Sequence, residues 1–340
     1  MNFIRKALRF SQRALESMVI RRVNDRAATL GHEPCSGRIR NFAERLGPLC
    51  VILFGMVPAY MTMALGQSPP AHPATPANRS GIAPLPRVNT PRLYVIDCGT
   101  LIFNRPEDYN LTRDEVADTN MPVPCFLVIH PKGILLFDTG LSDSLVGRPI
   151  YEHVIFNYGQ LKFNTLKGQL ADIGVSPADI TYLALSHSHF DHVGNANDFA
   201  GSIWLAQKAE FDVMFGAHAM TQGNSDFAAL AHARTQMIDG DHDVFGDGTV
   251  ILKYAPGHTP GHQCLFVQLA KTGGVLIAGD LYHYAEERTL HRIPTDEQTT
   301  ATPASRAKIE DFVKEKRAQL WIGHSTSFFR DAIKSPGWYE

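Results

Sequence analysis

The sequence predicts an α/β (α+β) fold in which two β-sheets are flanked by outer helices. Short runs rich in leucine, β-branched and aromatic side chains occur soon after residue 92, again in the middle of the chain and again near its end. Segments with helical spacing of apolar residues separate them. The chain has 340 residues, of which 44% are hydrophobic and 19% charged, which is long enough to bury such a core.

The expected strands, in chain order, are 92–98, 125–130, 133–139, 180–186, 202–206, 248–256, 264–270, 274–280 and 319–324. The turn "HPKG" between the second and third has the length that a hairpin requires. Apolar residues at helical spacing predict a helix over 166–173, which Gly174 ends, and a late helix around 309–313. Residues 207–248 carry mixed signals and predict no clear element.

The first 66 residues are typical of an export signal. Residues 1–45 carry ten Lys/Arg against four Asp/Glu, and twenty uncharged residues, "LGPLCVILFGMVPAYMTMAL", follow. This layout predicts cleavage before Gln67 and a periplasmic or secreted protein. A retained membrane anchor is the alternative, since twenty apolar residues can span a bilayer, but Pro48 and Pro58 favour removal. A start codon further downstream would shorten the leader without changing the prediction of export.

Residues 67–91 are expected to form a linker, because seven prolines and few large apolar side chains cannot support a packed core. The globular domain is therefore expected over 92–340. Since the chain as a whole has a net charge of −2 despite its basic leader, this domain is acidic. An acidic domain without a basic stripe argues against a nucleic-acid partner.

The cysteines predict buried thiols. Cys35 and Cys50 fall in the leader, whereas Cys98, Cys125 and Cys264 each lie in an apolar, strand-like run. An odd number without CxxC spacing argues against a disulfide framework, and a small buried thiol is the usual alternative.

The segment "HSHFDH", residues 187–192, concentrates metal-binding side chains at the end of an expected strand. His187 and His189 point to the same side of an extended chain, because side chains alternate, so both can reach one ion. Asp191 and His192 follow where the chain turns and can reach a second ion nearby. Three imidazoles and one carboxylate suit Zn²⁺ better than Ca²⁺ or Mg²⁺, which prefer oxygen ligands.

Further donors follow later strands. "GHTPGH" offers His258 and His262, and two other apolar runs end in Asp280 and His324. Taken alone, Asp280 could cap a turn and His324 could hydrogen-bond the backbone. Together with the first cluster they supply enough donors for two ions that share one carboxylate and one hydroxide.

This set resembles the metallo-β-lactamase superfamily, whose motif is HxHxDH followed by a lone His, a bridging Asp and a final His, and the resemblance covers about residues 92–330. It implies an αββα sandwich with two divalent metal ions, most readily Zn²⁺. The first ion would be held by His187, His189 and His262, the second by Asp191, His192 and His324, with Asp280 bridging. His258, and Asp138 of "FDTG", would then support the site without binding metal.

Within the superfamily, the stretches "YVIDCGTLIF", "APGHTPGHQCLFV" and "AGDLYHYAEER" resemble N-acyl homoserine lactonases, the quorum-quenching branch. Zinc β-lactamases lack the bridging Asp, and glyoxalase II-like thioesterases carry a longer helical region after it, so both are weaker alternatives. A catalytically silent binding scaffold is the alternative of a different class. The resemblance implies a small-molecule lactone substrate and a homodimer, with membrane contact only if the apolar segment is retained.

The implied mechanism is attack of a hydroxide, held between the two ions, on the lactone carbonyl. Asp191 would orient this hydroxide and protonate the departing ring oxygen. His283 occupies the position where many such lactonases carry Tyr, and either His283 or Tyr282 would contact the substrate carbonyl. Candidates for an apolar groove that accepts an acyl chain are Phe190, Met214 and Phe215, although each is also open to plain core packing.

Overall fold

The computed structural model describes residues 84–340 except 103–104, 149–150, 154–157 and 218–224. The expected leader, its apolar segment, Cys35 and Cys50 therefore lie outside the described residues, as does the linker up to residue 83. Residues 84–90 form neither helix nor strand. No helix among the described residues combines the length and apolarity needed to cross a membrane.

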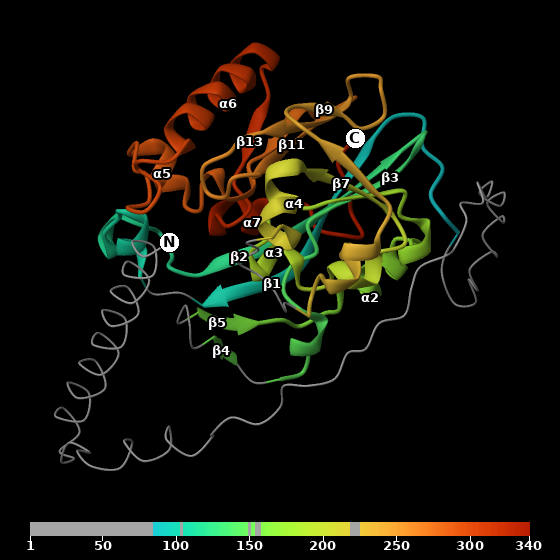
Figure 1. Ribbon diagram of the computed structural model, residues 1–340, viewed down its shortest axis with the longest axis horizontal. Coiled ribbons are helices and arrows are strands. Elements are labelled where there is room, and N and C mark those ends of the chain that lie inside the picture. The colour runs from blue at the N-terminus through green and yellow to red at the C-terminus, as the bar shows by residue number, and fades with distance from the viewer. Residues whose placement is uncertain (1–83, 103–104, 149–150, 154–157, 218–224) are drawn as a thin grey trace, which may run out of the picture. The chain divides into compact units, whose positions relative to one another are not determined.

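Two mixed β-sheets form the centre of the domain (Figure 1). The first has the order β4-β5-β1-β2-β3-β6-β7-β8 and the second the order β13-β12-β11-β10-β9. The strands of the first sheet are β1 (Arg92–Ile102), β2 (Met121–His130), β3 (Gly133–Phe137), β4 (Tyr151–His153), β5 (Tyr158–Leu161), β6 (Tyr182–Ala184), β7 (Ile203–Gln207) and β8 (Thr235–Ile238). Those of the second are β9 (His242–Asp243), β10 (Val250–Tyr254), β11 (Gln263–Leu269), β12 (Gly273–Ile277) and β13 (Gln319–Trp321).

Helices cover the outer faces of both sheets (Figure 1). The α-helices are α2 (Leu166–Asp172), α3 (Phe190–Val193), α4 (Lys208–Phe215), α5 (Ala285–Thr289), α6 (Thr302–Lys316) and α7 (Thr326–Asp331). One apolar cluster joins the first sheet to α2, α3 and α4, a second lies between the sheets, and a third joins the second sheet to α6. The predicted αββα sandwich is confirmed.

The strand sequences explain this layering. Along β1, Leu93 and Val95 enter the cluster between the sheets, whereas Tyr94 and Ile96 enter the cluster beneath the outer helices. Because successive side chains point to opposite faces and both faces are covered, the strand is apolar at four successive positions, Leu93–Ile96. The strands expected from apolar runs are confirmed. The segment 207–248 holds α4, β8 and β9, elements too short for their periodicity to stand out.

The expectation of three buried thiols is wrong for two of them. Cys98 and Cys125 form a disulfide with a Cα–Cα distance of 5.8 Å, whereas Cys264 is a buried free thiol. The pairing of β1 with β2 explains the bond, because Ile96 lies opposite Cys125 and the register shifts between Asp97 and Thr100. Strand register is a long-range property that the cysteine spacing did not reveal.

Candidate metal centre

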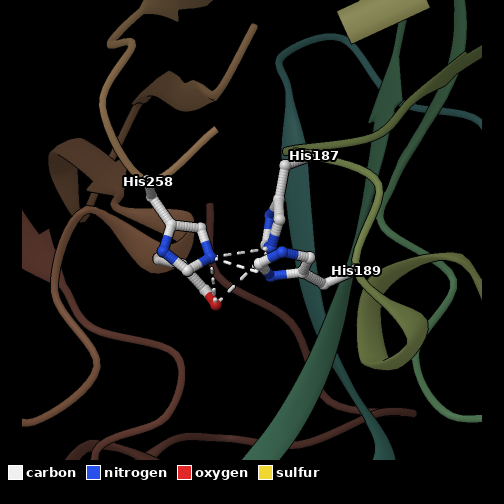
Figure 2. A group of neighbouring side chains, drawn as sticks. His187, His189 and His258 are labelled. Atoms are coloured by element: carbon white, nitrogen blue, oxygen red, sulfur yellow. Dashed lines mark hydrogen bonds and ion pairs between the residues drawn. The ribbon is translucent and has the colours of Figure 1, made fainter. Parts of the chain in front are cut away.

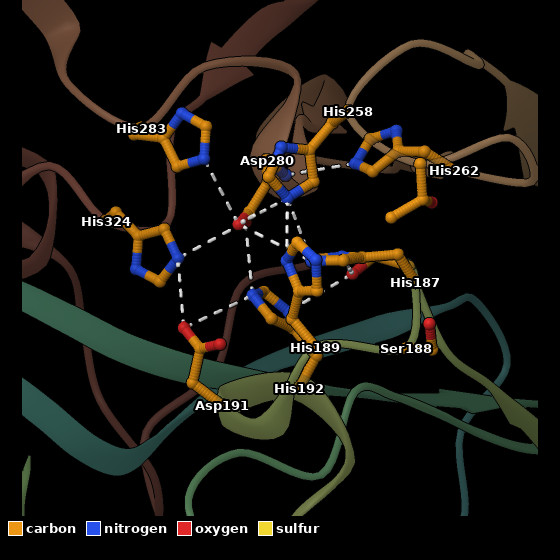
Figure 3. Close-up of polar contacts among 12 residues, drawn as sticks. His187, Ser188, His189, Asp191, His192, His258, His262, Asp280, His283 and His324 are labelled. Atoms are coloured by element: carbon orange, nitrogen blue, oxygen red, sulfur yellow. Dashed lines mark hydrogen bonds and ion pairs between the residues drawn. The ribbon is translucent and has the colours of Figure 1, made fainter. Parts of the chain in front are cut away.

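The segment "HSHFDH" lies where β6 passes into α3. After β6 ends at Ala184, the chain brings His187 and His189 to the edge of the sandwich, and α3 carries Asp191 and His192 (Figure 3). His187 is completely buried, whereas His189 is exposed. The strand end therefore presents both halves of the motif to one region, as the alternation of side chains predicts.

One donor group surrounds the Nε2 atom of His258. This nitrogen lies 2.9 Å from His189 Nδ1 and 3.2 Å from His187 Nε2 (Figure 2). Asp280 Oδ2 is 3.4 Å from His258 Nε2 and 3.6 Å from His187 Nε2. Three imidazole nitrogens and a carboxylate oxygen therefore converge, and all lie within 4.8 Å of one another.

A second donor group is formed by Asp191, His192 and His324. Asp191 Oδ2 lies 3.5 Å from the Nε2 atoms of both histidines. The other oxygen of Asp280, Oδ1, is 3.1 Å from His192 Nε2 and 3.2 Å from His324 Nε2. Asp280, in the short 3-10 turn after β12, thus directs one oxygen to each group. This is the position of a bridging ligand.

The electrostatics of these groups fit cations. His192 Nε2 and Asp280 Oδ1 are buried and lie 3.1 Å apart, but neither forms a hydrogen bond of good geometry with a described residue, so both atoms can accept a cation. Burial lowers the pKa of His258 to about 3 and that of His187 well below its usual value, so both imidazoles are neutral near pH 7. Burial disfavours the Asp280 carboxylate, but the neighbouring histidines, His192 and His324 foremost, hold its pKa well below the usual range.

His262 does not join the first donor group, and its expected place as a ligand is corrected. Its Nδ1 lies 3.0 Å from the carbonyl oxygen of Ala255, and its Nε2 accepts the backbone N–H of Asp280 at 3.0 Å. Both ring nitrogens are thus used by the backbone. Gly279, with φ +54°, lies against the ring, since a Cβ there would stand 2.8 Å from His262 Nε2. His258, expected only as a supporting residue, stands in the first donor group instead.

Other residues fix the orientation of the imidazoles. Asp138 Oδ2 lies 2.9 Å from His192 Nδ1, and its Oδ1 accepts the backbone N–H of Ser186 at 2.6 Å. The carbonyl oxygen of Pro122 lies 2.7 Å from His324 Nδ1. Such partners set the tautomer of a metal-binding histidine and leave Nε2 free for the ion. Asp138 therefore stands in the supporting position that the resemblance implied.

A cavity of about 670 Å³ opens beside both donor groups. Its apolar wall is formed by Leu101, Tyr109, Met121, Phe190 and Pro294. Phe190 therefore lies where a groove residue was expected. Met214 and Phe215 instead pack with the core cluster beneath α4. Core packing was the alternative expected for both residues.

Two neighbouring residues behave differently at this cavity. His283 lines it, with Nε2 at 3.4 Å from Asp280 Oδ2 and its ring centroid 4.5 Å from that of Tyr109. Tyr282 is not among the lining residues and donates its hydroxyl hydrogen to Glu310 at 3.1 Å. Of the two residues expected to contact the substrate carbonyl, His283 lines the cavity and Tyr282 does not.

The sequence reasoning missed Glu297 and Tyr109. Glu297 Oε1 lies 2.7 Å from His258 Nδ1, although the two residues are 39 positions apart, and Tyr109 belongs to a short 3-10 turn over Pro106–Tyr109. Neither residue follows an apolar strand or stands in a motif. Only the folded chain brings them to the site.

Residues 118–319 match the metallo-beta-lactamase superfamily model, and the chain belongs to this superfamily. Among its relatives, the N-acyl homoserine lactonase AttM of Azorhizobium caulinodans is 28% identical over 266 residues, covering 73% of this chain and 98% of the relative. The N-acyl homoserine lactonase AiiA of Bacillus thuringiensis subsp. kurstaki is 29% identical, covering 68% and 92%. The family resemblance inferred from the motifs is therefore confirmed.

A solved structure supports the same relationship. An N-acyl homoserine lactone hydrolase with its product, N-hexanoyl-L-homoserine, bound at its catalytic metal centre is 25% identical to this chain with a TM-score of 0.63. The match covers 74% of this chain and 100% of that one. The two chains therefore share their fold over nearly all of the described domain.

Proposed function

We propose that this protein is a dinuclear-metal hydrolase that opens the lactone ring of N-acyl homoserine lactones. The observation that carries the proposal is the position of Asp280, with one carboxylate oxygen toward each of two donor groups at the wall of a cavity. The names of the AttM and AiiA relatives support the substrate class.

Two divalent ions, most readily Zn²⁺, fit the donors present. His187, His189 and His258 would hold one ion, Asp191, His192 and His324 the other, and Asp280 would contact both. Such ions supply Lewis acidity toward a carbonyl oxygen and lower the pKa of water.

The residues of the chain supply proton transfer and orientation. Asp191 lines the cavity, and there its carboxyl group can hold a proton for the alkoxide that departs when the ring opens. His283 lines the same cavity and can donate a hydrogen bond to the oxygen that gains charge during attack. It would thereby take the role that many lactonases give to a tyrosine.

The wall of the cavity favours an uncharged, partly apolar substrate. Its apolar residues can accommodate an acyl chain. The carboxylate side chains that line it are Glu107, Asp108, Asp191, Asp280, Asp296 and Glu297. No Lys or Arg occurs among the described lining residues. Glu107, Asp108 and Asp296 are exposed and lie outside the two donor groups, so a carboxylate-bearing β-lactam or an anionic thioester would meet like charge there, whereas a neutral lactone would not.

We also propose that the protein acts outside the cytoplasm. The basic leader with its apolar segment supports this location, and so does the Cys98–Cys125 disulfide, because disulfides persist mainly in oxidising compartments. Cell fractionation and the N-terminal sequence of the mature chain would test it. A full-length chain in the cytoplasm would contradict the proposal, and one retained in the membrane would identify an anchor.

The activity is tested by proton release from N-acyl homoserine lactones of increasing acyl length, using the zinc-loaded full chain and Asp280→Ala. A thioester and a β-lactam serve as competing substrates. Lactone opening that disappears in Asp280→Ala supports the proposal. Two bound ions with thioester hydrolysis and no lactone opening would instead indicate a thioesterase, and binding of no metal would favour the silent scaffold.

A further inference from the structure

Glu297 forms the one charged contact to the back of the His258 ring among the described residues. Its Oε1 lies 2.7 Å from His258 Nδ1, on the side of the ring opposite the Nε2 atom that faces His187 and His189. A carboxylate can only accept a hydrogen bond, so Nδ1 carries the hydrogen and Nε2 keeps its lone pair. The contact therefore selects the tautomer that can bind an ion.

The carboxylate itself is held in place. Glu297 is 5% exposed, and its Oε2 accepts the hydroxyl hydrogen of Thr302 at 2.6 Å. Its backbone N–H donates to the carbonyl oxygen of Pro294 at 3.0 Å, and its carbonyl oxygen accepts the N–H of Thr300 at 3.1 Å. Both carboxylate oxygens thus accept hydrogen bonds from the protein itself. Glu297 is therefore placed to orient His258 and not to donate a proton to a substrate.

The segment that carries Glu297 and Thr302 also packs against the segment that carries Gly257 and His258. Thr302, the first residue of α6, is completely buried against Gly257, the residue before His258. A Cβ at Gly257 would stand 2.2 Å from Thr302 Oγ1 and 2.3 Å from its backbone nitrogen, and Gly257 has φ +148°. Glycine is therefore required for this close approach. The loop that carries Glu297 fixes both the backbone position and the ring orientation of His258.

We infer that Glu297, supported by Thr302, is a positioning residue that orients His258 for metal binding. This inference rests on the metal centre proposed above. The arrangement has the same logic as Asp138 with His192, so each of the two donor groups contains one histidine oriented by a carboxylate. His258 would lose affinity for its ion when this contact is removed, whereas the Asp191–His192–His324 group would not.

The test measures metal binding directly. Wild type, Glu297→Ala and Glu297→Gln full chains are titrated with Zn²⁺ against a chromophoric chelator, and their cobalt forms are compared by visible absorption. Glu297→Ala should weaken one of the two dissociation constants by about 10- to 100-fold and shift the cobalt bands of that ion. Glu297→Gln should show a smaller loss, because its amide oxygen can still accept the Nδ1 hydrogen. Thr302→Val should follow the same direction with a still smaller effect.

Asp296→Asn is the matched control. It changes the neighbouring carboxylate, which is exposed and has no hydrogen bond or ion pair with His258 among the described residues, and it should leave both constants and the cobalt spectrum unchanged. Wild-type binding and spectrum in both Glu297 variants would overturn the inference, as would an equal loss of both ions or the same loss in Asp296→Asn. Glu297→Gln preserves the size of the side chain and decides the matter if the alanine variant does not fold. None of these readouts uses a lactone, so failure of the proposed activity would leave the result interpretable.

Discussion

Glu210 accepts the backbone N–H of Ser188 through Oε1 at 2.8 Å. Its Oε2 accepts the hydroxyl hydrogen of Thr259 at 2.7 Å and the backbone N–H of Gly261 at 3.0 Å. The side chain is 4% exposed and projects from α4. One buried carboxylate therefore joins the "HSHFDH" segment to the "GHTPGH" segment, and the two halves of the first donor group depend on it.

Glu210→Ala is expected to leave three buried donors without an acceptor, each of which costs about 1–3 kcal/mol. The free energy of unfolding should fall by about 3 kcal/mol or more, measured by urea unfolding of the zinc-loaded protein. Asp212→Asn on the same helix is the control, because Asp212 is exposed and its one ion pair among the described residues is with exposed Lys208. Equal destabilisation by both variants would show that the effect belongs to the helix and not to the joined loops.

The sequence was sufficient for those parts of the site that depend on local geometry. His187 and His189 share a side because an extended chain alternates its side chains, and Asp280 and His324 meet the site because each follows a strand of the second sheet. The layers of the fold were likewise predictable, since apolar runs covered on both faces are visible in the sequence.

Long-range geometry accounts for what was missed. The choice between His258 and His262 depends on how one turn directs two rings, and both stand in the same six-residue motif. The Cys98–Cys125 bond depends on strand register, and the contact of Glu297 with His258 depends on the packing of α6 against Gly257. None of these leaves a periodic signal.

The different surroundings of His258 and His262 predict different losses. His258→Ala removes a nitrogen of the first donor group and should leave one ion tightly bound, measured as metal content after gel filtration. His262→Ala leaves the N–H of Asp280 and the carbonyl of Ala255 unpaired, so it should lower stability by about 1–3 kcal/mol for each group. If His262→Ala selectively lost one ion while His258→Ala kept two, His262 and not His258 would be the ligand.

Thiol chemistry tests the cysteine assignments. In a variant with Cys35→Ser and Cys50→Ser, the native protein should expose no reactive thiol, one after unfolding and three after unfolding with a reductant. Burial raises the pKa of the Cys264 thiol far above its usual value, so native labelling should stay absent even at pH 9, where an unperturbed cysteine is mostly thiolate. Rapid labelling of the native chain with Ellman's reagent would contradict this.

Loss of the disulfide should also lower stability. The bond closes a segment between positions 27 apart, for which the chain-entropy model gives about 3.5 kcal/mol. Cys98→Ser with Cys125→Ser should therefore unfold at lower urea concentration than the parent chain. Cys264→Ser, which removes a buried thiol outside the bond, is the comparison variant. An unchanged midpoint in the double variant would indicate that the bond adds no net stability.

Variants of His283 and Tyr282 test which residue donates a hydrogen bond to the substrate oxygen that gains charge. His283 faces the cavity, so His283→Ala should lower kcat/KM for N-hexanoyl homoserine lactone by about 10²–10³, as loss of one aligned donor does. Tyr282→Phe removes only the hydroxyl that donates to Glu310 and should leave kcat/KM near wild type. Because His283 Nε2 lies 3.4 Å from Asp280 Oδ2, metal content is measured in parallel. A fall in kcat/KM with two ions still bound assigns the loss to the missing donor, whereas a fall only in Tyr282→Phe would return the role to the tyrosine.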